Sequence, residues 1–358
     1  MYSEKFSETI HACRFCFMCR HLSPVGNVTY RESDTPRGRA LMLDKVSQQP
    51  QLLENPDFQS AIYDAELSAA CRTHCVSHFD EAGLLLAARR DIVESGKIPA
   101  VVKQVADSIK ALKLALKGDA KAEVIYYVDR YTERYQPEMA AATEKILKAA
   151  GVSFQIISGA DTGKALAVLG CWNEAKETAE KFAKSIRGVG KKVLITSCPA
   201  SYDLLKNDFP KYGIDLANEL EVLHTSEFIR RLVKAGKLSL RPSTAQSVFP
   251  LASDFLGNYN TGFTAHEELA ALAGVTLQPF GFNREESYTA GEGGVVMDEL
   301  NPRLVAKLVE HVLEQVDNPS QDMLLVLSPY TKYVLSKFAT KKLHLTTVEE
   351  LIAARIKE

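Results

Sequence analysis

Residues 122–158 read AEVIYYVDRYTERYQPEMAAATEKILKAAGVSFQIIS, and this segment fixes the fold class. Its first part is a short run of β-branched and aromatic residues, which is typical of a buried strand. A helical stretch follows that Pro137 opens and Gly151 closes, and a second strand comes after it. The order continues with a helix over 173–190 and with a strand, a turn and a helix over 191–205. Alternating strands and helices predict an α/β protein with a doubly wound parallel sheet.

A second copy of this pattern follows the first. LITSCPASYDLL (194–205) is echoed by LVLSPYTKYVL (325–335), which places Cys198 opposite Ser328. DTGKALAVLG (161–170) is echoed by TAGEGGVVMD (289–298), which places Gly163 opposite Gly291. The common order and the similar spacing predict an internal duplication. We therefore expect one α/β repeat over 121–220 and a second over 221–358.

The first 98 residues have a different character. Five of the seven cysteines lie within the first 75 residues. This clustering argues against a secreted disulfide framework and for metal binding in a reducing compartment. Apolar residues recur at helical spacing over 55–75 and again over 81–96, where Gly96 ends the pattern. We expect an all-helical domain over 1–98 and an amphipathic linker helix within 99–120, covering 99–118.

Length and charge exclude several classes of protein. The 358 residues carry a formal net charge of −2, which gives no electrostatic basis for binding nucleic acid. No apolar run approaches the roughly 20 residues that span a bilayer. The polar N-terminus lacks the apolar core of a signal peptide. We therefore expect a cytoplasmic protein that contacts a membrane only through a partner.

The cysteine spacing is that of an iron–sulfur ligand run. ACRFCFMCRHLSPVG (12–26) contains a C-x2-C-x2-C triplet, and Ser23 stands where a fourth cysteine would come. Cys71 and Cys75 are spaced like the last two cysteines of another such run. In two-cluster ferredoxins the last cysteine of each run binds the other cluster. The spacing therefore predicts one complete [4Fe–4S] site, made by Cys13, Cys16, Cys19 and Cys75.

The other site of such a pair is incomplete. Stepping back from Cys71 at the same spacing gives Ser68 and Ala65, and Ser23 takes the remaining position. Only Cys71 is left there, as a buried thiol without a metal. A zinc site that combines the triplet with Cys75 or His21 is the alternative for the complete site.

Three residues are candidates for the surroundings of the cluster: Cys71, His21 and Phe17. A histidine near a cluster can donate to its sulfur, although a surface or packing role suits His11, His21, His74 and His78 as well. The apolar side chains of Phe15, Phe17 and Met18 either cover the cluster or pack into a core.

At this point the residues resemble a known family. The chain is similar to the iron–sulfur subunits of glycolate oxidase and of anaerobic glycerol-3-phosphate dehydrogenase, and to the D subunit of heterodisulfide reductase. Besides the cysteine run, the resemblance is carried by VTYRESDTPRGRALML (28–43), VDRYTERYQPEMAAATEKILKAAGV (128–152), LEVLHTSEFIRRLVKAGKLSL (220–240) and NREESYTAGEGGVVM (283–297). The resemblance implies an α-helical ferredoxin domain followed by two cysteine-rich CCG-domain repeats.

The ligand positions of both CCG repeats are degenerate in this chain. By the resemblance, Asp161 and Thr162 replace the CCG cysteine pair of the first repeat, and Asp129 or Arg130 replaces its leading cysteine. Its CxxC keeps Cys198 and has Ser201 in place of the second cysteine. In the second repeat Thr289 and Ala290 replace the CCG cysteine pair, and Asp254 replaces the leading cysteine. Ser328 and Thr331 replace both cysteines of the CxxC. Hydroxyls and carboxylates are poor ligands for iron–sulfur chemistry, so we expect no metal at either set.

The resemblance implies a non-catalytic electron-transfer subunit of an oxidoreductase complex. Its one [4Fe–4S] cluster would relay electrons to or from an FAD-linked dehydrogenase or oxidase subunit, and a further carrier. No dinucleotide fingerprint and no catalytic triad stands out in the sequence. Two alternatives stay open. One is a scaffold or assembly subunit whose metal site is structural. The other is a protein that binds a small organic anion beside Asp161, Asp254 or Thr289.

Overall fold

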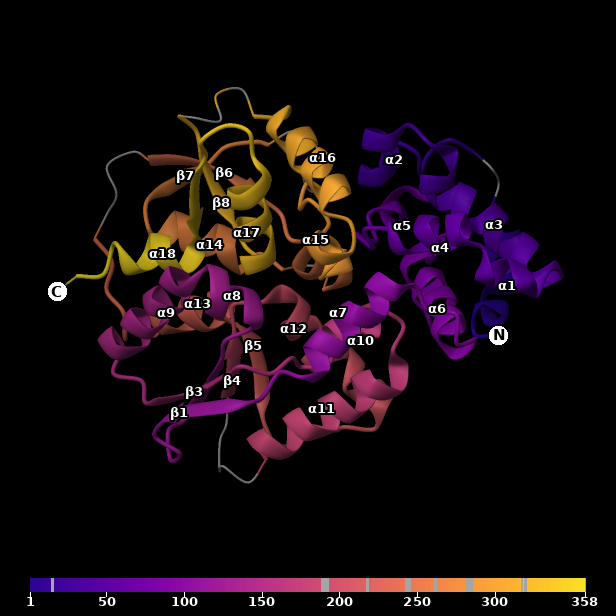
Figure 1. Cartoon of the computed structure of the whole chain (residues 1–358). Coiled ribbons are helices and arrows are strands. Elements are labelled where there is room, and N and C mark those ends of the chain that lie inside the picture. The colour runs from indigo at the N-terminus through magenta and orange to yellow at the C-terminus, as the bar shows by residue number, and fades with distance from the viewer. Residues whose placement is uncertain are drawn as a thin grey trace.

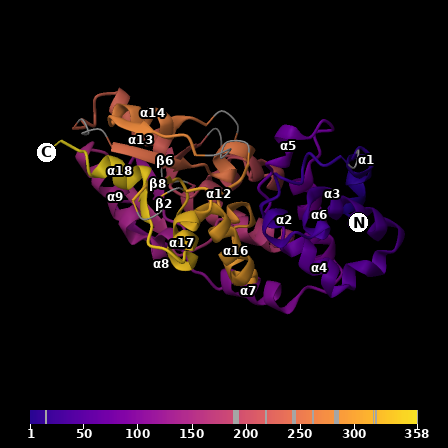
Figure 2. The ribbon, with the colours of Figure 1, turned by 90° about the horizontal axis from the view of Figure 1, so that it is seen from above.

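The computed structural model describes residues 1–13, 16–187, 193–216, 219–241, 246–260, 263–280, 286–316, 318 and 321–357. A helical N-terminal part lies beside a larger part that holds two sheets (Figure 1). Seen from above, the N-terminal helices occupy one end of the molecule and the C-terminus lies at the other (Figure 2).

The N-terminal elements are η1 (Ser3–Phe6), α1 (Ser7–His11), α2 (Pro24–Thr29), η2 (Glu32–Asp34), α3 (Pro36–Gln48), η3 (Pro50–Glu54), α4 (Pro56–Tyr63), α5 (Cys71–His74) and α6 (Glu81–Glu94).

Three of these helices begin in the same way. A polar side chain accepts a hydrogen bond from the first turn, and a proline occupies the first helical position. The capping residues are Ser23 for α2, Thr35 for α3 and Asn55 for α4. Helix α6 ends at Glu94, and Gly96 follows with a φ of 76°, so the predicted glycine stop is confirmed.

The first sheet contains β1 (Ala115–Gly118), β2 (Val124–Tyr127), β3 (Phe154–Ser158), β4 (Val193–Thr196) and β5 (Glu221–His224), in the order β1-β3-β2-β4-β5. Strands β3, β2, β4 and β5 are parallel, and β1 pairs antiparallel with β3. The helices of this half are α8 (Arg130–Tyr135), α9 (Pro137–Ala149), α10 (Lys164–Val168), α11 (Trp172–Ile186), α12 (Pro199–Asp203), η4 (Leu204–Asp208), η5 (Pro210–Tyr212) and α13 (Thr225–Lys234).

The second sheet is parallel throughout. It contains β6 (Gln246–Leu251), β7 (Val275–Leu277), β8 (Met323–Val326) and β9 (His344–Thr347), in the order β7-β6-β8-β9. Its helices are η6 (Phe255–Tyr259), α14 (Ala265–Leu272), η7 (Glu292–Gly294), α15 (Met297–Leu300), α16 (Pro302–Leu313), α17 (Pro329–Phe338) and α18 (Val348–Ala353). The predicted α/β class with parallel sheets is confirmed.

The expected helix over 99–118 is wrong in its second half. Helix α7 covers Ala100–Lys110, where Val102, Val105 and Ile109 form its buried face. Residues 115–118 instead form β1, which hydrogen-bonds along the edge of β3. A free sheet edge offers backbone partners that outweigh the moderate helix propensity of ALKG.

The helical pattern over 55–75 is interrupted. Helix α4 ends at Tyr63 and the one-turn helix α5 begins at Cys71. Between them Leu67 and Ala69 adopt left-handed conformations, with φ of 53° and 58°. Residues without glycine's freedom hold such conformations only where their surroundings fix them. The contacts that fix this segment come from the C-terminal half of the chain, as shown below.

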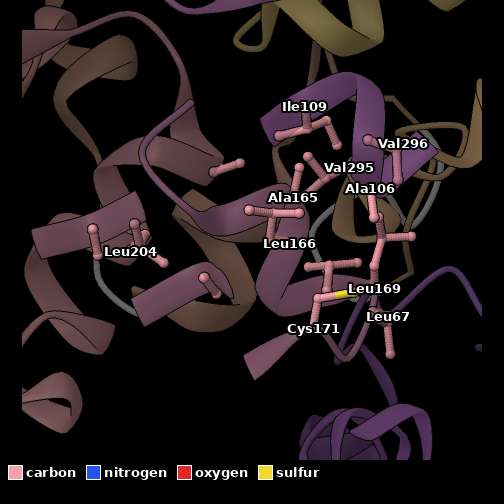
Figure 3. Packing of buried hydrophobic residues seen from close by; sticks show 14 of the residues in the cluster. Leu67, Ala106, Ile109, Ala165, Leu166, Leu169, Cys171, Leu204, Val295 and Val296 are labelled. Carbon is pink, nitrogen blue, oxygen red and sulfur yellow. The ribbon is translucent and has the colours of Figure 1, made fainter. Parts of the chain in front are cut away.

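The junction between the helical part and the α/β part is apolar. Leu67 lies there with Ala106 and Ile109 of α7, Leu166 of α10 and Val296, all of them buried (Figure 3). A second core lies between the two sheets, where α9, α13 and α18 meet strands of both. The N-terminal part is therefore packed against the rest through a continuous apolar core.

Candidate metal centre

Five cysteines from two distant segments line one small cavity. Cys13, Cys16 and Cys19 come from the loop between α1 and α2, and Cys71 and Cys75 come from α5 and its C-terminal end. The other side chains of the wall are Met18, Arg37, Val76, Ser77 and Phe79. The structure thus brings together all four predicted ligands, and it adds Cys71 to them.

One hydrogen bond joins the two segments, and local hydrogen bonds order each of them. The Ser77 hydroxyl donates to the carbonyl of Ala12 at 2.8 Å. The amide of Cys13 donates to Ile10 at 3.1 Å, and the amide of Cys75 donates to the carbonyl of Cys71 at 3.0 Å. None of these three bonds uses a cysteine sulfur.

The five thiols differ in exposure. Cys16 is exposed, Cys13, Cys19 and Cys75 are half-buried, and Cys71 is buried. Burial raises the pKa of Cys19 to about 11, although a backbone hydrogen bond from Arg37 opposes the shift. All seven cysteines are free of disulfides. Among the described residues, no three His, Cys, Asp or Glu side chains are grouped so as to hold a single metal ion.

Cys71 is bound to a buried ionic group. Its Sγ donates to Oε2 of Glu81 at 3.5 Å, and Arg39 donates to the other oxygen of Glu81 at 3.0 Å. Arg39 also lies 4.0 Å from Glu66, and all three charged side chains are buried. Burial, with the carboxylate of Glu81 beside it, holds the pKa of Cys71 well above that of a free thiol. Cys71 therefore stays protonated in this setting.

The other positions expected for the incomplete site form protein hydrogen bonds, and one of them, Ser68, lies beside the ionic group. Ser23 caps α2 and donates to the carbonyl of Asp34 at 2.9 Å. The carbonyl of Ala65 accepts a hydrogen bond from Arg89 at 2.8 Å, and the Ser68 hydroxyl lies 3.4 Å from Glu66. Protein hydrogen bonds and charged side chains occupy this region. Sequence reasoning missed Arg39, Glu66 and Glu81, because burial of a charged residue leaves no local pattern.

The apolar residues of the cysteine loop point outward. Phe17 is 65% exposed and Met18 is 46% exposed, so the alternative in which they pack into a core is wrong for both. The guanidinium of Arg37 lies 4.1 Å from the ring centre of Phe17, and Met18 lines the cavity. His21 packs edge-on against His74, with 6.0 Å between ring centres. Phe15 lies outside the described residues.

Residues of the two degenerate CCG sets share a second cavity. Asp161, Cys198 and Ser201 of the first set face Ser328 of the second across a space of about 20 Å³. Asp129 and Arg130, the two candidates for the leading position of the first set, also line it, together with Tyr131, Lys164, Ala200, Glu292, Val295 and Tyr330. Thr162, buried, and Ala290 do not line it. Burial holds the pKa of Cys198 well above its usual value, so this thiol is also protonated.

The remaining members of the second set form their own hydrogen bonds. Asp254 accepts from Thr289 at 2.5 Å, and the hydroxyl of Thr331 donates to the carbonyl of Thr289 at 3.3 Å. Ser328 caps α17 and accepts from the amide of Thr331 at 3.4 Å. The buried carboxyl of Glu292, which the sequence analysis did not single out, belongs to this group.

Comparison with known proteins gives three informative relatives. The chain is 30% identical to a probable iron-sulfur-binding oxidoreductase, FadF, of Bacillus subtilis, over 59% of this chain and 30% of FadF. It is 25% identical to a probable membrane-anchored ferredoxin of Chromohalobacter salexigens, over 66% and 40% of the two chains. It is 22% identical to the D subunit of heterodisulfide reductase from Methanosarcina barkeri, over 79% and 74%. The chain thus spans well under half the length of the first two relatives.

The structural comparison concerns the fold alone. A crystal structure of a hypothetical protein from Helicobacter pylori matches with a TM-score of 0.61 at 10% identity, covering 100% of this chain and 76% of that one. No protein-family model matches the chain. Within the described part of the chain, no helix has the length and apolar character of a membrane span. In sequence the chain is thus similar to a probable iron–sulfur-binding oxidoreductase and to the heterodisulfide reductase D subunit.

Proposed function

We propose that the chain is an electron-transfer subunit with one [4Fe–4S] cluster held by Cys13, Cys16, Cys19 and Cys75. The observation that carries this proposal is the convergence of these sulfurs on one cavity, from two segments 56 or more residues apart. Thiolate is the donor that iron–sulfur clusters require, so the donor set fits the group. When bound, such a cluster supplies one-electron redox chemistry.

The choice of Cys75 over Cys71 rests on their surroundings. Cys71 is bound to Glu81 and keeps its proton, whereas a ligand must be a thiolate. Cys75 follows α5 in an extended conformation and is half-buried, and no carboxylate hydrogen bond to its sulfur was found among the described residues. Cys71 then serves as a positioning residue between the ionic group and the cavity wall.

The partner is expected to approach the mouth of the cavity. Phe17, Met18 and Val76 are exposed there, and Val76 is 76% exposed. Exposed apolar side chains in a group favour a protein contact. The resemblance and the relatives favour an oxidoreductase complex with a flavin-containing subunit, in a reducing compartment such as the cytoplasm.

For the architecture we propose a cluster-bearing helical domain over 1–98, a linker over 99–120 and two repeats over 121–220 and 221–358. The two sheets support the presence of two repeats, since each contains a strand that leads into a helix whose N-cap is Cys198 or Ser328. The first sheet extends beyond the proposed limits of its repeat, because β1 lies in the linker range and β5 lies in the second range. The degenerate positions of the repeats hold no metal in this proposal. They keep the fold through their own hydrogen bonds.

One observation favours a second candidate, a scaffold whose metal is structural. Arg39, Glu66 and Glu81 fill the region where a second cluster would continue an electron path. A single cluster can staple the helical domain without relaying electrons, and zinc could do so as well.

Metal analysis with spectroscopy tests the proposal. Protein purified without oxygen should hold about four irons and matching sulfide per chain, and dithionite should produce an S = 1/2 EPR signal. Cys75→Ser should abolish the signal, and Cys71→Ser should keep it. Stoichiometric zinc without sulfide would exclude electron transfer and leave the scaffold. A signal lost in Cys71→Ser but kept in Cys75→Ser would overturn the ligand assignment.

A further inference from the structure

Asp254 and Glu292 are buried neighbours from two elements of the second repeat. Asp254 precedes η6, and its amide donates to the carboxyl of Glu292 at 2.6 Å. Ser253 donates to the other oxygen of Glu292 at 2.8 Å. The carboxyl of Asp254 accepts from the hydroxyls of Ser287 at 2.6 Å and Thr289 at 2.5 Å, and from the amide of Gly293 at 3.2 Å. Every one of these donors is neutral.

Among the described residues, no cation forms an ion pair with either carboxyl. Lys164, in the adjoining cavity, is bound to Asp203 at 2.6 Å and to Asp208 at 2.8 Å. Arg130, in the same wall, is bound to Glu299. The other titratable groups that face the pair are acids or neutral: Glu66, Asp129, Asp161, Cys198, Tyr259 and Tyr330.

Two adjacent carboxylates without a counter-ion repel each other strongly in a dry interior. One proton bound to either carboxyl removes this repulsion. The pKa of each group has the direction that this arrangement requires. Burial raises the pKa of Asp254 to about 6. Burial and the charge of Asp254 raise the pKa of Glu292 to about 8.

Residues close to the pair in sequence hold the segment 66–69, which precedes Cys71 and Cys75. We call these contacts the clamp. Asn258 donates to the carbonyl of Ser68 at 2.8 Å, and the Tyr259 hydroxyl donates to the carbonyl of Leu67 at 2.7 Å. Gly293, which donates to Asp254, packs against the backbone of Leu67. These contacts hold the left-handed conformations of the segment in place.

Glu66, the first residue of the clamped segment, has a buried carboxyl. Its Oε2 is buried without a hydrogen-bond partner, and its counter-ion Arg39 is 4.0 Å away and is shared with Glu81. A second negative charge on the Asp254–Glu292 pair would therefore face a third carboxyl across the junction, and this repulsion would oppose the clamp.

We propose that Asp254 and Glu292 form a proton-binding site that holds one proton at neutral pH, and that this proton keeps the clamp on residues 66–69 closed. Release of the proton to water leaves two negative charges beside Glu66 and loosens the segment. The link to the cluster rests on the proposed function, since Cys75 follows this segment. The proton site itself depends only on the second repeat.

Hydrogen exchange on the intact protein tests the site. After correction for the intrinsic pH dependence of amide exchange, the protection factors of the 67–72 amides should fall about tenfold between pH 6.5 and pH 9. Glu292→Gln should abolish this fall, because a neutral amide replaces the acid that releases the proton. Glu349→Gln is the matched control: Glu349 is an equally buried carboxyl, bound to Thr225 and remote from the clamp.

Two results would overturn the proposal. One is that the corrected protection factors of the 67–72 amides in the wild type do not change with pH. The other is a fall that persists in Glu292→Gln. If that variant does not fold, infrared spectra of the wild type and of Asp254→Asn decide instead. One carboxylic acid band should vanish between pH 6 and pH 9 in the wild type and shift in Asp254→Asn. Iron and sulfide analysis of the same samples reports separately on the cluster.

Discussion

Gly293 lies in contact with the backbone of Leu67, across the junction between the α/β part and the helical part. A Cβ placed on Gly293 would come within 2.2 Å of the Leu67 carbonyl oxygen and 2.6 Å of that of Glu66. Because both neighbours are backbone atoms, neither can move aside without shifting the segment that precedes Cys71 and Cys75. This one contact couples the packing of the second repeat to the position of the cysteines.

Gly293→Ala should therefore destabilise the protein by about 3 kcal/mol through overpacking. The loss should be visible as a lower midpoint in urea unfolding. Gly257→Ala is the matched control, since a Cβ there meets no atom within 4 Å. It should change the free energy of unfolding by about 0.5 kcal/mol or less. Equal effects of the two substitutions would mean that the junction yields to the added methyl group.

The buried ionic group leads to a second prediction. Arg39→Met should leave Glu81 and Glu66 buried without a cation and should cost about 3–5 kcal/mol of unfolding free energy. The comparison is Arg231→Met, which breaks exposed ion pairs with Glu221 and Glu227. Its cost should stay at or below about 1 kcal/mol. A small loss for Arg39→Met would show that water or protons readily replace the guanidinium there.

Local patterns predicted the elements of the fold well, because each signal lies in a few adjacent residues. The strand at Val124–Tyr127 and the helix from Pro137 were predicted in place, and the four proposed ligands lie together as the spacing suggests. The strand Ala115–Gly118 was missed, since its reason is the free edge of β3 rather than its own residues.

Long-range electrostatics was not predictable in this way. No local sequence pattern indicates that Arg39 and Glu66 are buried neighbours. The segment GEGG (291–294) likewise does not indicate that Glu292 contacts Asp254. The anion site expected beside Asp254 stays a prediction, and Glu292 is the neighbour that the structure shows there. Such pairs arise only when distant elements are packed together.

Stability should depend on pH through the buried acids. Burial raises the pKa of Glu66 to about 7, of Asp254 to about 6 and of Glu292 to about 8. A carboxyl with a raised pKa binds more protons in the folded state, so its contribution is complete below the unfolded pKa, which is 3.8 for Asp254 and 4.5 for the two glutamates. It is lost as pH rises toward the folded value.

The free energy of unfolding should therefore fall between about pH 5 and pH 8, by up to about 1.4 kcal/mol per pH unit for each proton released. Urea unfolding of wild type and Glu292→Gln across this range measures the difference. The variant should show the shallower slope. Identical slopes would mean that Glu292 is ionised in the folded protein already at pH 5.

The acid side of the stability profile should be set in part by His224. This side chain is buried, caps α13 by accepting from the amide of Ser226 at 3.3 Å, and lies near the Ser197 carbonyl. Burial lowers the pKa of His224 to about 3, well below the unfolded value of about 6.5. The unfolded chain then binds the extra proton, so this residue's contribution is present above pH 6.5 and is lost as pH falls toward 3.

His224→Asn keeps a capping acceptor and removes the titration, since asparagine caps helices well and carries no charge. The difference in unfolding free energy between wild type and variant should be constant above pH 7. It should shrink progressively below pH 6, as the wild type loses stability that the variant does not lose. Exposed His344→Asn is the control and should show no such trend. A difference that stays constant down to pH 4 would mean that His224 titrates in the folded protein as it does in water.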